Sequence, residues 1–315
     1  MDKVTELSLA GQNLKRFPAA VRKLSKLESL LLAGNNFADL PEWLTELPLK
    51  RLDYSGNKLS QVPSIVRKLE RLEWLKLGED PLEELPDFLS EMPELASLFL
   101  MGINKLVLTT LPKSFAQSSL KELDLYGCRR FTTVPEVIQQ MSKLRRLQLN
   151  WLKLSELPNW LGDLPLQELS LGKMPLTLLP DSLYQMQLEA LSLSDLDELG
   201  VPTQLGSMKH LKRLTIQPGM VKSGEQVVPA SLGELTQLEE LHLVNIEFDS
   251  PPAWLSKFKQ LRRLYLPATK FTEPPRVLAE LPKLEWINLR YAPQLKGREA
   301  EVKALVPNAE LIMPT

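Results

Sequence analysis

Leucines recur along the chain in the pattern Leu-x-x-Leu-x-Leu, in which the last two leucines are two residues apart. Alternation with a period of two is typical of a β-strand, so both leucines point to one side and the residue between them points to the other. Each predicted strand is short, and its neighbours are the same strand in the adjacent copies. The pattern therefore predicts a parallel sheet on one side of the protein. The clearest copies are residues 27–32, 120–125 and 144–149.

Between the predicted strands, prolines recur at spacings of 22–27 residues and introduce a second pattern, x-x-Leu-x-x-Leu, as in residues 41–47. A spacing of three is typical of a helical or 3₁₀ turn, and proline fits at its start, where a missing N–H costs nothing. A period of this length predicts a solenoid of stacked units, which curves because its turn side is wider than its strand side. The prolines are Pro18, Pro41, Pro63, Pro86, Pro112, Pro135, Pro158, Pro180, Pro202, Pro229, Pro252 and Pro275.

Together these motifs resemble the leucine-rich repeat family, in its intracellular and bacterial form with Leu-Pro repeats of about 22–24 residues. The resemblance implies an α/β solenoid: a curved leucine-rich repeat horseshoe of about 12–13 repeats, with a parallel concave β-sheet and convex 3₁₀ or short helical turns. We expect a single solenoid over residues 1–315, with repeats over 4–289 and a C-terminal cap over 290–315. Within the cap, residues 297–305 are predicted to form a helix and residues 310–313 a last strand.

The resemblance also implies an asparagine ladder, in which Asn, Cys or Thr three residues after the second strand leucine bonds to backbone between turns. Asn35 and Asn57 fit this position. We expect Cys128 to be a structural ladder residue rather than a nucleophile. Apolar side chains at this position cannot bond to backbone, so they are expected to tighten the core. Other ladder positions hold Asp80 and Thr269 as substitutes, and Leu152, Met174, Leu196 and Ile246 as apolar replacements.

Charge and cysteine content restrict the classes of function. The formal net charge is −1, and charges on the outward strand positions alternate in sign, so the chain lacks the basic stripe that binds nucleic acid. No apolar run reaches the roughly 18 residues that span a bilayer, so we expect no membrane partner. A single cysteine allows no intrachain disulfide, which favours a cytoplasmic protein. Export into a host cell as an effector is the alternative.

Residues that could support catalysis are few and far apart. The two histidines, His210 and His242, lie in different repeats, and Cys128 is about five repeats from His242. At about 4.8 Å per strand this separates Cys128 and His242 by some 24 Å, far beyond the ~3 Å of a nucleophile–base pair. No cluster of His, Cys and carboxylate residues has metal-ligand spacing. We therefore expect no enzyme activity, no cofactor and no metal.

Candidate binding residues lie at the outward-facing strand positions, because the inward positions belong to the core. Exposed aromatic residues surrounded by charge are typical of the centre of a protein interface. In contrast, Trp43, Trp160 and Trp254 follow prolines and are expected to cover the turns of neighbouring repeats. Two groups are predicted to bind a partner on the concave face: a central patch of Trp74, Lys76, Phe99, Met101, Asp124, Tyr126, Arg146, Gln148 and Trp151, and a C-terminal patch of His242, Arg263, Tyr265, Trp286, Asn288, Arg290 and Tyr291.

Two repeats are longer than the rest, near residues 101–119 and 217–228. Insertions in solenoids often map to the binding face, although loops also absorb extra length at little entropic cost. The first predicted strand, residues 5–9, has an open edge. An open edge can pair with a second copy of the chain, so edge-to-edge self-association is a further expectation.

The leading functional hypothesis is a non-enzymatic recognition module that binds a protein or peptide on its concave face. Two alternatives stay open. One is the substrate-recruiting domain of a bacterial host-directed effector, and the other is a scaffold resembling the Leu-Pro repeat proteins that bind small GTPases or phosphatases. The fold alone does not separate them, because repeat proteins share a fold without sharing partners.

Overall fold

A computed structural model of the chain divides into two compact units, Met1–Leu154 and Ser155–Thr315. In the residues that it describes, no helix is long and apolar enough to cross a membrane. The expected single solenoid with a separate cap stays a prediction. The described residues are 3–79, 82, 84–102, 111–196, 198–219, 228–246, 248–267 and 269–314.

The first unit contains a parallel sheet whose strands follow one another in sequence order. Each strand pairs with the strand of the next repeat, and equivalent leucines lie side by side: Leu30 is in register with Leu52, and Leu52 with Leu75. All three side chains are fully buried, as the two-residue alternation predicts. The strands are β1 (Glu6–Ser8), β2 (Ser29–Leu31), β3 (Arg51–Asp53), β4 (Trp74–Gly78), β5 (Ser97–Met101), β6 (Glu122–Asp124) and β7 (Arg146–Gln148).

The second unit repeats this arrangement. Leu214 is in register with Leu241, and Leu241 with Leu264, and all three are buried. Burying a leucine side chain contributes about 1.5–3 kcal/mol, so the column of leucines is the main source of stability. The strands are β8 (Glu168–Gly172), β9 (Ala190–Ser194), β10 (Arg213–Gln217), β11 (Glu240–Leu243), β12 (Arg263–Tyr265), β13 (Trp286–Asn288) and β14 (Glu310–Ile312).

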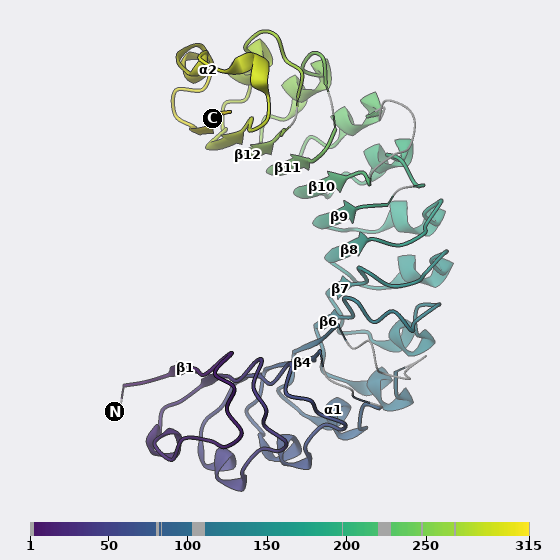
Figure 1. Ribbon diagram of the computed structural model, residues 1–315. Helices are drawn as coiled ribbons and strands as arrows, with labels where there is room; N and C mark the ends of the chain where they lie inside the picture. The colour runs from purple at the N-terminus through teal and green to yellow at the C-terminus, as the bar shows by residue number, and fades with distance from the viewer. Residues whose placement is uncertain are drawn as a thin grey trace. The chain divides into compact units, whose positions relative to one another are not determined.

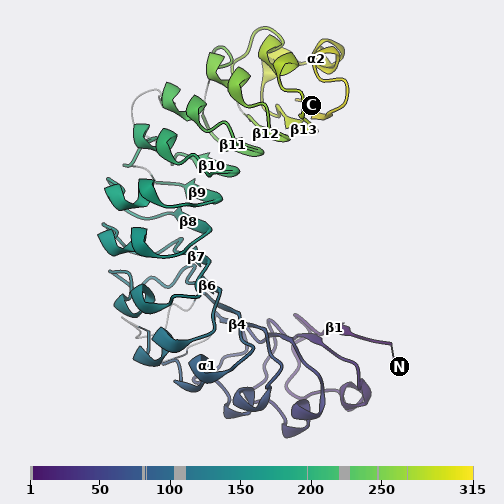
Figure 2. The ribbon, with the colours of Figure 1, turned by 180° about the vertical axis from the view of Figure 1, so that it is seen from behind.

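In each unit, short 3₁₀ helices lie on the side opposite the strands, as the views from front and back show (Figure 1, Figure 2). Most begin directly after a repeat proline, as predicted. Pro41 is typical: its backbone is extended, and its carbonyl accepts a hydrogen bond from the N–H of Leu44 at 3.1 Å. The central parts of both long repeats, 103–110 and 220–227, lie outside the described residues.

These turn elements have the following bounds. In the first unit they are η1 (Val21–Lys23), η2 (Glu42–Glu46), η3 (Ser64–Lys68), the short α-helix α1 (Phe88–Glu91), η4 (Lys113–Gln117) and η5 (Glu136–Gln140). In the second unit they are η6 (Asn159–Asp163), η7 (Asp181–Gln185), η8 (Thr203–Ser207), η9 (Ala230–Glu234), η10 (Ala253–Lys257), η11 (Arg276–Glu280), η12 (Pro293–Leu295) and helix α2 (Glu299–Leu305).

Asn35 and Asn57 form the predicted ladder. The side-chain amide of Asn35 donates to the carbonyls of Leu9 and Leu32 at 2.8 and 2.9 Å, and its oxygen accepts from the N–H of Leu14 at 2.9 Å. One repeat later, Asn57 donates to the carbonyl of Leu32 at 3.0 Å. Because both amides are buried, these bonds satisfy backbone groups that water cannot reach.

Cys128 is a ladder residue, as expected: it is buried, and its thiol donates to the carbonyl of Leu100 at 3.0 Å. The ladder role expected of Thr269 is wrong, since its buried hydroxyl has no hydrogen-bond partner among the described residues. Asp80 lies outside the described residues. The apolar replacements pack into the core as expected, and Leu152, Met174, Leu196 and Ile246 are all buried.

Tryptophans on the turn side pack against neighbouring repeats. Trp43 meets the ring of Phe17 edge-on, with the ring centroids 5.6 Å apart. Trp254 lies against Gly233 in the preceding turn, where an added Cβ would stand only 2.6 Å from the Cβ of the tryptophan. The covering role predicted for these two residues is confirmed. Trp160 lies in η6 and is half-buried.

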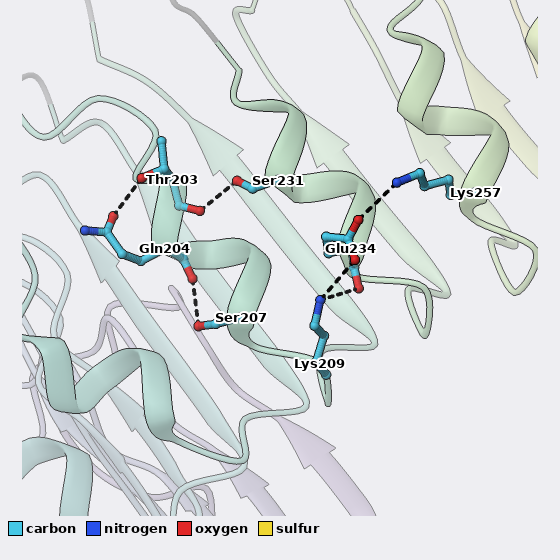
Figure 3. A network of polar contacts seen from close by, with 7 residues as sticks. All are labelled: Thr203, Gln204, Ser207, Lys209, Ser231, Glu234 and Lys257. Atoms are coloured by element: carbon cyan, nitrogen blue, oxygen red, sulfur yellow. Dashed lines mark hydrogen bonds and ion pairs between the residues drawn. The ribbon is translucent and has the colours of Figure 1, made fainter.

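Polar contacts also connect successive turns of the second unit (Figure 3). The hydroxyl of Ser231 donates to the carbonyl of Thr203 at 2.7 Å. Glu234 bridges two lysines from adjacent turns, Lys209 at 3.5 Å and Lys257 at 3.0 Å. All three charged side chains are more than half exposed, so these ion pairs add little stability. They show that this side of the unit is occupied by contacts between its own repeats.

At the C-terminus, the helix and the strand predicted from sequence both form. Helix α2 covers Glu299–Leu305 and buries Val302. Strand β14 then pairs with β13, so that Trp286 is in register with Glu310. The side chain of Arg298, at the start of α2, bonds to Glu273 at 2.8 Å and thereby ties the helix to the preceding repeat.

Gly78 offers a test of how closely the strands approach. Its φ is +155°, and a Cβ at this position would stand 2.0 Å from the carbonyl oxygen of Met101 on β5. Gly78→Ala should therefore lower the free energy of unfolding by about 2–4 kcal/mol, measured by urea denaturation. The control is Gly11→Ala, which has a φ of +69° but no atom within 4 Å of the added Cβ, and should cost about 1 kcal/mol. Equal losses in the two variants would contradict this packing.

Candidate functional site

Outward side chains of the strands, together with the residues that directly follow each strand, form what we call the strand face of each unit. The central patch lies wholly in the first unit, on β4–β7 and the turns that follow β6 and β7. The C-terminal patch lies wholly in the second unit, on β11–β13 and the turn after β13. The two patches are therefore independent candidate sites.

An aromatic pair and an arginine make up one half of the central patch. The ring centroids of Trp74 and Phe99, from adjacent strands, are 4.9 Å apart. The guanidinium of Arg51 lies over the indole, 3.8 Å from its centroid, which is within the range of a cation–π interaction. Lys76 lies between the two strand leucines of β4 and is in register with Phe99. All four side chains are at least partly exposed, and none belongs to the core.

The other half of the patch repeats this composition in the turns after β6 and β7. The rings of Tyr126 and Trp151 stack with centroids 5.8 Å apart and an angle of 16° between planes. The guanidinium of Arg129 lies 4.5 Å from the centroid of Trp151. The aromatic residues of the central patch thus form two pairs, each with an arginine over a tryptophan.

Trp151 occupies a backbone position that favours glycine. It is the second residue after the last strand leucine, where Gly34 and Gly127 adopt φ of +66° and +74° in earlier repeats. Trp151 has a φ of +62° and Tyr291, at the same position in its repeat, +68°. A bulky side chain in this region costs about 1–2 kcal/mol relative to ordinary backbone. Glu79, Lys173, Asp195 and Asn245 have a positive φ at the same position of their repeats, so this backbone conformation is a property of the repeat turn. Among the described residues, Trp151 and Tyr291 are the aromatic residues that adopt it, at a cost to stability.

Arg146 of the central patch is already engaged in an ion pair. The guanidinium of Arg146 pairs with the carboxylate of Glu122 at 3.1 Å, and the same carboxylate oxygen accepts from the hydroxyl of Ser97 at 2.9 Å. Glu122 is only 14% exposed, so this network is a fixed part of the surface. Gln148 and Met101 are half-buried beside it on β7 and at the end of β5.

Asp124 and Asn288 differ from the expectation for partner-binding residues, because both are buried rather than exposed. The carboxylate of Asp124 accepts from the N–H of Tyr126 at 2.8 Å, and the amide oxygen of Asn288 accepts from the N–H of Arg290 at 2.9 Å. Each therefore holds the turn after its strand. Burial raises the pKa of Asp124 to about 6, and the nearby charge of Glu122 adds to this shift.

Three aromatic rings in a row form the C-terminal patch. His242 and Tyr265, in register on adjacent strands, have ring centroids 5.4 Å apart. Tyr265 then stacks on Trp286, with centroids 6.2 Å apart and planes inclined by 13°. Tyr291 is 66% exposed and points away from the core. The patch thus offers a stacked aromatic wall and one projecting ring.

Burial lowers the pKa of His242, and the positive charge of Arg263 acts in the same direction, while Glu240 opposes them. At neutral pH the imidazole is therefore uncharged, and the 2.9 Å contact between its Nε2 and Glu240 is a hydrogen bond in which the histidine donates. A hollow of about 510 Å³ lies beside it, lined by Glu240, His242, Arg263, Glu285, Trp286 and Glu310.

Sequence reasoning missed the two arginines that cover the tryptophans. Arg51 lies in the same outward column as Trp74, one repeat earlier, so the repeat register could have found it. Arg129 lies in an irregular turn and had no such signal. Among the described residues, no three His, Cys, Asp or Glu side chains are grouped so that they could hold a metal ion.

Comparison with known proteins supports the fold. A sequence profile described as Leucine Rich Repeat matches residues 119–141. A leucine-rich repeat protein from Leptospira interrogans has a similar structure, with a TM-score of 0.50 and 24% identity over 98% of this chain and 95% of that one. An internalin from Listeria monocytogenes has a TM-score of 0.53 and 19% identity, covering 98% of this chain and 82% of its own.

A third similar structure is the leucine-rich repeat ectodomain of a plant membrane receptor kinase from Arabidopsis thaliana, in complex with CASPARIAN STRIP INTEGRITY FACTOR 2. It has a TM-score of 0.52 and 19% identity, over 95% of this chain and 42% of that one. A search of curated protein sequences finds no match. The chain has the leucine-rich repeat fold, and the resemblance stated from its motifs is confirmed.

Asp124 makes the stability of the first unit depend on pH. In the folded protein the carboxyl of Asp124 stays protonated up to about pH 6, whereas in the unfolded chain it loses its proton near its ordinary pKa of 3.8. Stability should therefore fall as pH rises through this window, by up to about 3 kcal/mol. Asp124→Asn keeps the oxygen that accepts from Tyr126, as Asn288 does in its own repeat, and should flatten this dependence and raise stability at neutral pH.

The measurement is urea unfolding followed by circular dichroism between about pH 4 and pH 8. Asp124→Ala serves as the control, since it also removes the charge but leaves the N–H of Tyr126 without its acceptor. Ala should lose stability relative to Asn at every pH. An unchanged slope in the Asn variant would show that another group is responsible.

Proposed function

We propose that this chain is a non-enzymatic recognition module that binds a protein partner through its strand face. The aromatic pairs of the strand face carry this proposal. Trp74 with Phe99, and Tyr126 with Trp151, are partly exposed aromatic pairs that lie outside the leucine core. Such side chains are enriched among the residues that dominate binding energy in protein interfaces.

The turn side and the strand face of the units differ in how their aromatic and charged side chains are used. On the turn side, aromatic residues such as Trp43 and Trp254 pack against neighbouring repeats, and charged residues pair across turns. On the strand face, arginines lie over tryptophans, and Trp151 and Tyr291 occupy strained backbone positions. A partner that contacts these side chains would give a reason for keeping them. The expected cytoplasmic location stays a prediction.

The test compares two variants of the whole chain in affinity capture, followed by measurement of the dissociation constant with the purified captured protein. The strand-face variant combines Trp74→Ala, Phe99→Ala and Trp151→Ala. Each truncation should weaken binding by about 1–4 kcal/mol, or roughly 5- to 1000-fold, because it removes apolar surface from the interface centre. A parallel variant, Tyr265→Ala with Trp286→Ala, tests the C-terminal patch.

The matched control is the turn-side double variant Arg22→Ala with Glu46→Ala, which removes an exposed ion pair from the opposite side of the first unit. It should bind like the parent, and circular dichroism should show that all variants are folded. If both strand-face variants bind as tightly as the parent and only the control is impaired, the strand face is not the binding surface.

A further inference from the structure

We infer, building on the protein-recognition function proposed above, that the central patch binds a protein segment that carries carboxylates next to a large apolar side chain. Three properties of the patch define this partner: an exposed aromatic centre, cations without an ion pair, and carboxylates already engaged within the protein.

The aromatic centre fits an apolar side chain. Trp74 and Phe99 on one side, and Tyr126 and Trp151 on the other, are only partly buried and belong to consecutive repeats. Met101, also half-buried, lies at the end of β5, the strand that carries Phe99. Methionine and aromatic side chains together form surfaces that adapt to large apolar groups.

In the described part of the chain, three cations on this face have no ion pair, whereas Arg146 is already paired with Glu122. Arg51 and Arg129 lie over tryptophan rings at 3.8 and 4.5 Å, and Lys76 lies on β4 next to Phe99. Among the described residues, none of these three side chains forms an ion pair with a carboxylate of the chain. An arginine that is stacked on an indole has already lost part of its water shell and is held in one orientation. Pairing it with an incoming carboxylate therefore costs less desolvation and less side-chain entropy.

The carboxylates on the same face are engaged in internal bonds. Glu122 accepts from Ser97 and pairs with Arg146, and Asp124 is buried and accepts from the N–H of Tyr126. Asp53 accepts from the hydroxyl and the N–H of Ser55.

Among the described residues, Glu79, in the turn after β4, is a further carboxylate next to this face, and it is exposed. Lys76 is balanced by the neighbouring carboxylates of Asp53 and Asp124. At the two tryptophans, the described residues therefore offer a partner an excess of positive charge from the guanidiniums of Arg51 and Arg129, although the net charge of the whole chain is −1. This local excess favours an acidic partner and disfavours a basic one.

The C-terminal patch has a different charge pattern, which makes the inference specific to the central patch. Its hollow is lined by one arginine, Arg263, and by three carboxylates, of which Glu240 bonds to His242 and Glu285 pairs with Arg262 at 2.7 Å. Neither tryptophan-stacked arginine of the central patch has a counterpart among these lining residues, so this hollow offers an acidic segment less.

Single-stranded nucleic acid also combines negative charge with apolar rings. It fits the central patch less well, because the three cations are not arranged as a continuous track along a backbone.

The experiment is a selection of random displayed peptides on the whole purified chain, followed by fluorescence anisotropy with the selected peptides. Peptides with Asp or Glu beside Trp, Phe or Leu should be enriched. Arg51→Glu combined with Arg129→Glu should weaken their binding by at least about tenfold, and added salt should weaken binding to the parent. The control Lys23→Glu reverses an exposed charge on the turn side of the same unit and should change nothing.

Each other outcome overturns the inference. Enrichment of basic or uncharged peptides whose binding depends on Trp74 or Trp286 would reject the acidic partner and keep the proposed recognition function. Tighter binding of a single-stranded oligonucleotide than of any peptide would replace the protein partner with nucleic acid. Failure to enrich any peptide that depends on the strand face would reject the acidic segment, while the captured-protein test above would still decide the proposed function separately.

Discussion

Within each unit, the strands that the structure describes pair with the strands of the adjacent repeats. Paired strands lie about 4.8 Å apart. Every other part of a repeat must fit that spacing. On the turn side, glycines such as Gly162, Gly206 and Gly233 allow turns to approach where a Cβ would stand 2.3–2.6 Å from the neighbouring repeat. On the strand side, Gly78 meets the carbonyl of Met101 in the same way. The leucine columns fill the space between the strands and the turns, and the asparagine ladder satisfies buried backbone groups there.

Because this constraint is met by inward and turn-side residues, the outward side chains of the strands are free to vary. The type of outward side chain differs between groups of strands. On β8–β10 the positions between the strand leucines hold Ser170, Ser192 and Thr215, whereas the two patches hold stacked aromatic rings and arginines. At Trp151 and Tyr291 an aromatic residue occupies the positive-φ position that holds Gly, Glu, Lys, Asp or Asn in other repeats. The arrangement is that of a rigid scaffold that presents selected side chains.

Much of the fold could be predicted from sequence because it depends on periodicity. Leucines two apart fixed the strands, and the prolines located the 3₁₀ turns. The roles of Asn35 and Cys128 followed from position alone. The ladder role predicted for Thr269 was wrong, because the position of a residue in the repeat does not determine which groups its hydroxyl can reach. Burial of Asp124 and Asn288 and the stacking of Arg129 on Trp151 depend on turn geometry, which the repeat pattern does not encode.

The central claim is that the strand-face aromatics are kept for binding and not for stability. Urea unfolding of Tyr291→Gly tests it most directly, because this ring is 66% exposed and its backbone has a φ of +68°. Replacement by glycine should raise the free energy of unfolding by about 0.5–1 kcal/mol, as relief of backbone strain exceeds the entropy that glycine adds to the unfolded chain. Tyr291→Ala, which keeps the strain, should give no gain. A loss of stability in the glycine variant would contradict the account.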